Sequence, residues 1–162
     1  MKEIPLTGKY GKGKFALIDD EDFERVKQHL WYLDKSNGSF RPATWIKRKN
    51  VFLYWFIMGV KNVDHKNGNT LDSTRTNLRI CTQSQNGANR KKQRTFRGKP
   101  TSSSYKGVSR NGSKWEASIQ VNRKSIYLGR FNDEIDAAQT YNEAAQFYFG
   151  EFAKLNEFES AA

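Results

Sequence analysis

A polar segment in the middle of the chain brings together residue types that could do acid–base and metal chemistry. It reads VDHKNGNTLDSTRTNLRICTQSQNGANR and contains the adjacent pair Asp64 and His65, followed by several asparagines. A carboxylate and an asparagine oxygen can hold one hard cation, and such oxygen-rich ligation suits Mg²⁺ or Mn²⁺ better than zinc. With a reference pKa of ~6.5, a neutral His65 could take a proton from water while the cation stabilises charge on a phosphate. The alternative is a surface histidine that caps a turn.

The pattern around this pair indicates which elements position it. We expect a strand over 63–65, a loop with a turn at 67–68, a second short strand around 78–81 and a helix that begins near 82–84. The segment has few apolar residues and many Asn, Thr and Gln, which is typical of a site rather than a core.

The residues before this segment predict a compact α+β region over 1–60 that supports it. We expect a strand at 15–18, then a helix capped by Asp19 or Asp20, and then a hairpin with its turn at Asn37-Gly38. The apolar run NVFLYWFIMG is a buried strand or a strand that leads into a short helix, and Gly59 ends it. We interpret His29, the second histidine, as an ordinary helix residue.

The positive charge of the chain is gathered in one place. Lys and Arg outnumber Asp and Glu by 28 to 17, and no acidic residue occurs from Ser73 through Trp115. That window contains Arg75, Arg79, Arg90, Lys91, Lys92, Arg94, Arg97, Lys99, Lys106, Arg110 and Lys114. A strip of one sign favours a polyanion such as nucleic acid, with a solvated basic linker as the alternative.

The composition also argues against several classes of protein. Cys81 is the only cysteine, which excludes an intrachain disulfide and a zinc site built from cysteine pairs. No signal peptide is recognisable, and no apolar run approaches the ~20 residues that cross a bilayer. We therefore expect a soluble cytoplasmic protein with no membrane partner and no small-molecule cofactor.

The C-terminal third predicts a sheet followed by a helix. YKGVSR, KWEASIQV and SIYLGRF alternate as strands of a three-stranded meander, with turns at Asn111-Gly112 and at 122–124. An amphipathic helix follows, capped by Asp133 and stopped by Gly150. Its expected inner face is Ile135, Ala138, Tyr141, Ala145 and either Tyr148 or Phe149.

The central segment resembles the ββα-metal motif of phage and intron-encoded HNH endonucleases, in the branch whose third motif residue is asparagine. D-H, N-L-R and Q-N occur in the order and at the spacing of that family. The resemblance implies that Asp64 and Asn86 bind the metal and that His65 is the general base. It also implies that Asn77 fixes the loop and the histidine, and that Asn89 and Arg90 lie near the scissile phosphate.

Upstream, ALIDDEDFERVKQHLWYLD and FIMG are also similar to the N-terminal region of that family. One departure stands just before I-M-G, where the family commonly carries His-Arg and this chain has Tyr54-Trp55. The departure affects a secondary phosphate contact or a packing role, and it leaves the metal and base residues in place.

Residues 104–156 resemble the AP2 DNA-binding domain, whose sheet lies in the DNA major groove with the helix packed behind it. YKGV, KWEASI, YLGRF, AAQTYNEAA and FYFGEFAKLN carry the resemblance. It implies that Trp115, Ile119, Ile126 and Leu128 are core residues. The outward, DNA-facing residues would be Lys106, Ser109 or Arg110, Lys114, Ser118, Gln120, Ser125 and Tyr127. A small module for protein contact is the alternative.

Together these features predict an α+β protein with a nuclease domain over 1–90, a basic linker over 91–103 and an AP2-like domain over 104–158. The expected function is a homing-type DNA endonuclease that uses Mg²⁺ or Mn²⁺ to hydrolyse a phosphodiester. We expect a monomer that nicks one strand of duplex DNA in a bacterial or phage-infected cell. Lys91, Lys92, Arg94 and Arg97 of the linker would add contacts to the DNA backbone. A non-catalytic DNA-binding regulator and an RNA-cleaving enzyme are the alternatives.

Overall fold

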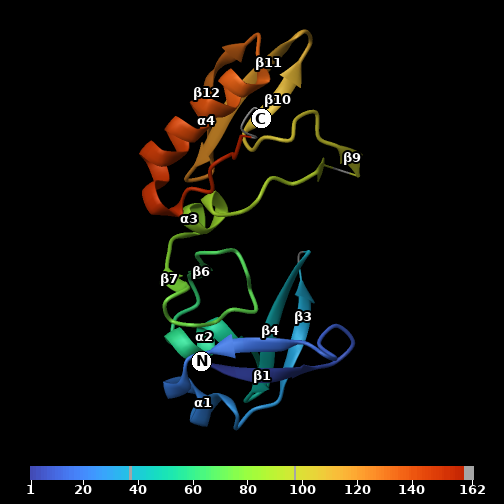
Figure 1. Cartoon of the computed structure of the whole chain (residues 1–162), viewed down its shortest axis with the longest axis vertical. Helices are drawn as coiled ribbons and strands as arrows, with labels where there is room; N and C mark the ends of the chain where they lie inside the picture. The colour runs from blue at the N-terminus through green and yellow to red at the C-terminus, as the bar shows by residue number, and fades with distance from the viewer. Residues whose placement is uncertain (37, 97, 159–162) are drawn as a thin grey trace. The chain divides into compact units, whose positions relative to one another are not determined.

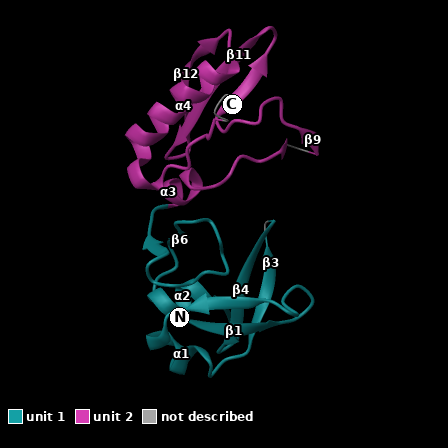
Figure 2. Ribbon diagram, viewed as in Figure 1, with its two compact units in different colours: residues 1–82 teal, residues 83–162 magenta. Residues whose placement is uncertain are grey.

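The computed structural model describes residues 1–36, 38–96 and 98–158, and the chain divides into two compact units, 1–82 and 83–162 (Figures 1 and 2). Both units combine mostly antiparallel sheets with a few helices, so the fold is α+β as expected. The expected turn residue Asn37 and the expected DNA contact Arg97 fall outside the described residues.

The first unit is built on a five-stranded sheet in the order β2-β1-β3-β4-β5. β1 runs parallel to β3, and all other neighbouring strands are antiparallel. Its elements are β1 (Lys2–Thr7), β2 (Phe15–Ile18), α1 (Asp20–Val26), β3 (Trp31–Ser36), β4 (Ser39–Ile46), β5 (Lys49–Phe52), α2 (Leu53–Met58), β6 (Val63–His65) and β7 (Leu78–Ile80).

Side chains from β1 to β7 form the core of this unit. β1 was not expected from the sequence, because only Ile4 and Leu6 alternate inward along it and Pro5 stands between them. Trp31 is the largest fully buried side chain, and its indole N–H donates to the Val26 carbonyl at the end of α1 (2.9 Å). That bond satisfies the one polar atom of the ring inside an apolar core.

The apolar run before the polar segment forms a strand that leads into a short helix, the second of the two expected alternatives. β5 passes directly into α2, whose Leu53 and Ile57 are buried. Gly59 ends α2 in the left-handed region at φ 73°, a conformation that favours glycine.

The second unit begins with a short helix and continues into the meander and long helix expected from the sequence. Its elements are α3 (Gln83–Ala88), β8 (Thr95–Phe96), β9 (Lys99–Pro100), β10 (Val108–Asn111), β11 (Lys114–Val121), β12 (Lys124–Phe131), α4 (Glu134–Phe149) and the 3₁₀ turn Gly150–Phe152. β10, β11 and β12 pair in that order, and all pairs are antiparallel. Asp133 caps α4 by accepting from the amides of Ile135 and Asp136.

The inner face of α4 differs from the expected one at a single position near the start of the helix. Ala137, Ala138, Tyr141, Ala145 and Phe149 are buried. Ile135 was expected inside but is 44% exposed, and the small Ala137 is buried instead, on the same face as Ala138 and Tyr141. The alanines let the sheet approach closely, and a Cβ at Gly107 would stand 1.8 Å from Cδ2 of Tyr141.

The boundary between the units lies after residue 82, whereas the sequence placed a domain boundary after residue 90. The reason is packing: Ala88 of α3 is buried in one cluster with Ile119, Tyr141, Ala145 and Phe149. The expected linker 91–103 contains the two-stranded hairpin β8–β9. None of the described helices is long and apolar enough to cross a membrane.

Candidate functional site

Asp64 lies on β6 directly opposite Arg79 of β7, and the two side chains form a buried ion pair. Arg79 donates from Nε (3.0 Å) and Nη2 (2.9 Å) to Oδ2 of Asp64. The side chains are 10% and 7% exposed, so the pair is largely removed from water. Such charge-assisted contacts fix the carboxylate in one orientation. Sequence reasoning counted Arg79 only as part of the basic strip and missed this partnership.

His65 follows Asp64 on β6 and is also buried. Its ring packs edge-on against Tyr54 of α2, with the ring centroids 5.6 Å apart. Burial lowers the pKa of His65 to about 4, although the charges of Asp64 and Asp72 act in the opposite direction. The imidazole is therefore neutral near pH 7, which is the form that accepts a proton. The turn-capping surface histidine offered as the alternative does not fit this burial.

The loop between β6 and β7 is closed by Asn77. Its Oδ1 accepts from the amide of Asn67 (3.0 Å), and its Nδ2 donates to the carbonyl of Asp72 (2.7 Å). The amide of Lys66 donates to the Asn77 carbonyl (2.9 Å), next to the His65–Leu78 pair of the ladder. Asn77 thus ties both ends and the middle of the loop together, which fits the structural part expected of it.

The same loop is attached to the five-stranded sheet. The amide of Leu17 on β2 donates to the Leu71 carbonyl (2.8 Å), and the amide of Ser73 donates to the Leu17 carbonyl (2.9 Å). These two bonds form a short parallel bridge at the edge of the sheet. The hydroxyl of Thr70 also donates to the carbonyl of Phe40 on β4. The sheet therefore positions the loop that follows His65.

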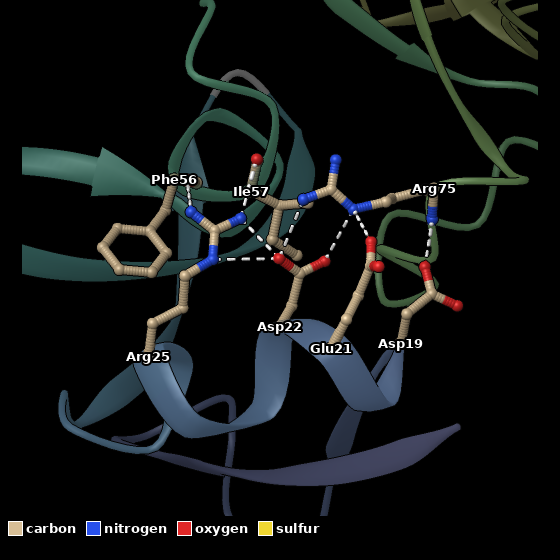
Figure 3. A network of polar contacts seen from close by, with 7 residues as sticks. All are labelled: Asp19, Glu21, Asp22, Arg25, Phe56, Ile57 and Arg75. Atoms are coloured by element: carbon tan, nitrogen blue, oxygen red, sulfur yellow. Dashed lines mark hydrogen bonds and ion pairs between the residues drawn. The ribbon is translucent and has the colours of Figure 1, made fainter.

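A buried carboxylate in α1 anchors the loop from a third side (Figure 3). Asp22 is 1% exposed and accepts from Arg25 and Arg75. Arg75 belongs to the loop; its side chain also pairs with Glu21, and its amide donates to Asp19 (2.7 Å).

Arg25 extends the same network to the end of α2. It donates to the carbonyls of Phe56 (3.2 Å) and Ile57 (2.9 Å). The network therefore joins α1, α2 and the β6–β7 loop. The sequence gives no sign of it, because Asp22 and Arg75 are 53 positions apart.

Asn86, the other residue expected to bind metal, lies half-buried on α3 in the second unit. Contacts within that unit hold α3. The amide of Asn122 donates to the Ser84 hydroxyl (3.0 Å), and the amide of Lys154 donates to the Ala88 carbonyl (3.1 Å). Asn89, which is half-buried, and Arg90, which is exposed, follow directly.

Two lysines expected to contact DNA are half-buried and donate hydrogen bonds within the second unit. The ammonium of Lys106 donates to the carbonyls of Ala88 and Arg90 at the end of α3, the second at 2.8 Å. Burial lowers the pKa of Lys106 to about 8. The ammonium of Lys92 donates to the Val108 carbonyl (3.1 Å). The expectation that Lys106 points outward is wrong, because the free carbonyls at a helix C-terminus attract a cation.

The other expected contacts lie at the surface of this unit. On the β11–β12 ladder Ser118 stands opposite Tyr127, and Gln120 stands opposite Ser125. These four side chains share the face away from the core, and Tyr127 is 61% exposed. Lys91, Arg94, Arg110 and Lys114 are exposed as well. The guanidinium of Arg110 lies over the ring of Trp115 (5.6 Å), and Trp115 packs with the core.

The donor chemistry of the site fits a magnesium-type cation better than a zinc-type one. Among the described residues there is no group of three or more His, Cys, Asp and Glu side chains that could hold a metal. Asp64 and Asp72 are the two carboxylates of the amide-rich segment 63–90. Mg²⁺ usually binds through one or two carboxylates and keeps several of its waters.

Comparison with known proteins identifies the family. No protein-family model matches the chain. An uncharacterized HNH endonuclease of Acanthamoeba polyphaga mimivirus is 33% identical over 155 residues, which cover 92% of this chain and 78% of that protein. The aligned region includes both units, because 92% of the chain is more than either unit contains. The chain therefore belongs to the HNH endonuclease family.

Proposed function

We propose that the protein is a metal-dependent DNA endonuclease of the homing type that nicks one strand of a duplex. The observation that carries the proposal is the β6–β7 hairpin, which holds a buried carboxylate and a buried imidazole at successive positions of one strand. A loop fixed by Asn77 and by the Asp22 network then holds both in place. Preorganised groups of this kind are what hydrolysis of a phosphodiester requires.

In the proposed reaction His65 accepts a proton from a water molecule as the water attacks phosphorus. The bond from phosphorus to the 3′ oxygen breaks, and the departing oxygen takes up a proton from solvent water, while His65 later releases its proton to solvent. Tyr54 packs against the imidazole and keeps its ring in one orientation while it does so. General base catalysis of this kind contributes ~10²–10⁴-fold to a rate.

Asp64 would hold the cation, with Asn86 as the second ligand that the family resemblance implies. A bound Mg²⁺ or Mn²⁺ would neutralise charge that develops on the phosphate and on the departing oxygen. Arg79 would orient the carboxylate by donating from Nε and Nη2 to Oδ2.

The second unit would hold the enzyme on duplex DNA through its exposed sheet face and basic residues. Ser118, Gln120 and Tyr127 share one face of the ladder, and Lys91, Arg94 and Lys114 are exposed. Replacing these three basic residues with Gln should weaken binding and lower the slope of log affinity against log salt by ~1 for each lost phosphate contact. Lys27→Gln is the control, because Lys27 pairs with Glu24. Filter binding at several salt concentrations measures both quantities, and an unchanged slope would assign the second unit to another partner.

The proposed cleavage is tested on supercoiled plasmid with Mg²⁺, with Mn²⁺ and with EDTA. The intact protein should convert the plasmid to open circles only with metal, and His65→Ala should lower the rate by ~10²–10⁴-fold while DNA binding persists. His29→Ala is the matched control, since it removes the other histidine, which packs on Phe56. Cutting in EDTA would contradict the metal site, and equal rates for His65→Ala would contradict the general base. Tight binding without cleavage by any form would instead indicate a DNA-binding regulator.

A further inference from the structure

Arg41 differs from the other arginines that are packed into the first unit. Arg25 and Arg75 pair with Asp22, and Arg79 pairs with Asp64. Arg41 is half-buried, yet it makes no ion pair with a carboxylate among the described residues. This holds although Asp34 stands directly opposite it on the neighbouring strand. A guanidinium partly withdrawn from water without a counter-ion is unfavourable, and a bound anion would relieve that state.

The side chain of Arg41 is held in a defined position rather than left in solvent. Its guanidinium lies over the ring of Phe52 with 4.6 Å to the ring centroid. Its Nη2 donates to the hydroxyl of Ser36 (2.8 Å). Its buried Nε has no hydrogen-bond partner among the described residues. Arginine has five N–H donors in a fixed plane, so donors remain for a further ligand.

A row of aromatic rings leads from Arg41 to His65. Phe52, on which the guanidinium lies, is stacked on Tyr54 with centroids 5.6 Å apart and ring planes 11° apart. Tyr54 in turn packs edge-on against His65 at 5.6 Å. Burial raises the pKa of Tyr54 and lowers the pKa of His65, and the positive charge of Arg41 acts to lower both, so Arg41 lies within electrostatic reach of the two side chains.

The stretch around Arg41 is suited to an anion. No Asp or Glu occurs from Lys35 through Val63, so β4, β5 and α2 supply no carboxylate. Lys35, Lys47, Lys49 and Lys61 add further positive charge to the same stretch. Arg79, which stands opposite Asp64 on the β6–β7 ladder, is engaged with that carboxylate. Arg41 is therefore a half-buried arginine that makes no ion pair among the described residues.

We propose that Arg41 forms a phosphate-binding site beside His65 and holds a non-bridging oxygen of the DNA phosphodiester that is cleaved. This inference rests on the proposed nuclease function and adds a substrate contact to it. Arg41 reaches the phosphate from β4, from the side of Tyr54, while Asp64 and His65 lie on β6. A planar guanidinium matches two phosphate oxygens, which a lysine ammonium does not.

The first experiment observes the arginine itself, without metal and without cleavage. The Nε–H resonances of the intact protein are followed by ¹⁵N NMR in EDTA while duplex DNA, or inorganic phosphate, is added. The resonance assigned to Arg41 by its loss in Arg41→Gln should shift with both additives, whereas that of the exposed Arg48 should not shift with phosphate. An Arg41 resonance that stays unmoved at saturating DNA would overturn the proposal.

The second experiment uses nicking rates. Arg41→Gln should lower kcat by ~10²-fold with a smaller change in KM, because the contact strengthens as charge develops on the phosphate. Methylguanidinium should restore part of the rate, and Arg41→Lys should remain impaired. Arg48→Gln removes the same charge from the exposed β4–β5 turn and should leave kcat unchanged. An unfolded variant is recognised by its thermal transition.

The two proposals can fail separately. An Arg41 shift on DNA without nicking by any form keeps the phosphate site and rejects the nuclease. Normal nicking by Arg41→Gln, with no Arg41 shift, keeps the nuclease and rejects the phosphate site.

Discussion

Asp22 and Asp64 are both buried carboxylates bonded to arginine, but they join very different parts of the first unit. Asp22 receives Arg25 and Arg75, which also bond to α2 and to Asp19, so one carboxylate connects three separate segments. Asp64 receives Arg79 from the residue directly opposite it on the next strand. The first cluster maintains the architecture of the unit, and the second orients one side chain within a hairpin.

This difference decides what each carboxylate can do. The arginines around Asp22 approach both of its oxygens, which suits a purely structural charge. Arg79 donates from Nε and Nη2 to Oδ2 of Asp64, and His65 is the next residue of the chain. A buried ion pair is weak evidence for stability, so its position beside a possible base is the more informative fact.

The largest expected effect separates activity from stability at Asp64. Asp64→Asn alone leaves Arg79 buried without a countercharge, which should cost about 3 kcal/mol of the free energy of unfolding. Adding Arg79→Met should recover most of that loss, because replacing a buried pair by an apolar side chain is often neutral. Nicking should remain ~10³-fold lower in the double variant, since the cation ligand is gone.

Urea unfolding and plasmid nicking measure the two quantities of this comparison on the same preparations. Recovery of activity together with stability would mean that Asp64 serves structure alone, as Asp22 does.

The next largest effect is a loss of stability at Asp22, which a second substitution at its arginine partner should not restore. Asp22→Asn should lower the free energy of unfolding by about 3 kcal/mol, toward the lower end for a broken buried pair because Arg25 and Arg75 are 42% and 44% exposed. Adding Arg75→Met should lower stability further, because Arg75 also pairs with Glu21.

Glu24→Gln provides the control for Asp22, since the exposed Lys27–Glu24 pair contributes ~0.2–1 kcal/mol at most. Urea midpoints at constant m-value report these differences. If adding Arg75→Met to Asp22→Asn raised the free energy of unfolding, Arg75 would serve only to neutralise Asp22. The Asp22 cluster would then behave like the Asp64–Arg79 pair, and the contrast between the two carboxylates would be lost.

Much of the fold could be predicted from the sequence because the signals are local. β11 alternates apolar and polar residues, the turn at 122–123 has positive φ at both residues, and Gly59 caps α2 as expected. β1 was missed because only two of its residues point into the core. The phase of α4 was misjudged at Ile135, where a large apolar residue is exposed and the small Ala137 is buried.

The chemistry of the site was visible in the sequence only where neighbours in the chain form it. Asp64 and His65 are adjacent, and Asn77 closes a loop that starts next to them. The partners of these residues come from elsewhere: Arg41 lies on β4, and Asp22 bonds across 53 positions. Residue type alone assigned Arg79, Lys92 and Lys106 to a basic strip, whereas packing uses all three inside the protein.

The smallest expected effect concerns Lys106. Helix carbonyls hold this cation, whereas guanidinium groups hold the carboxylates of Asp22 and Asp64. Lys106→Met keeps the aliphatic stem and removes the bonds to α3, so it should cost about 1 kcal/mol or less. Burial lowers the pKa of Lys106 in the folded protein to about 8, below the ordinary lysine pKa of 10.5, so the unfolded chain binds more protons between these two pH values. The stability of the intact protein relative to Lys106→Met should therefore rise as the pH increases from about 8 to 10.5.

Urea titrations of both proteins across this pH range measure the difference for Lys106. A relative stability that falls as the pH increases would show that the carbonyls hold the ammonium more strongly than burial disfavours it. The carbonyls at the end of α3 would then act on Lys106 as Arg25 and Arg75 act on Asp22, through full compensation of a buried charge.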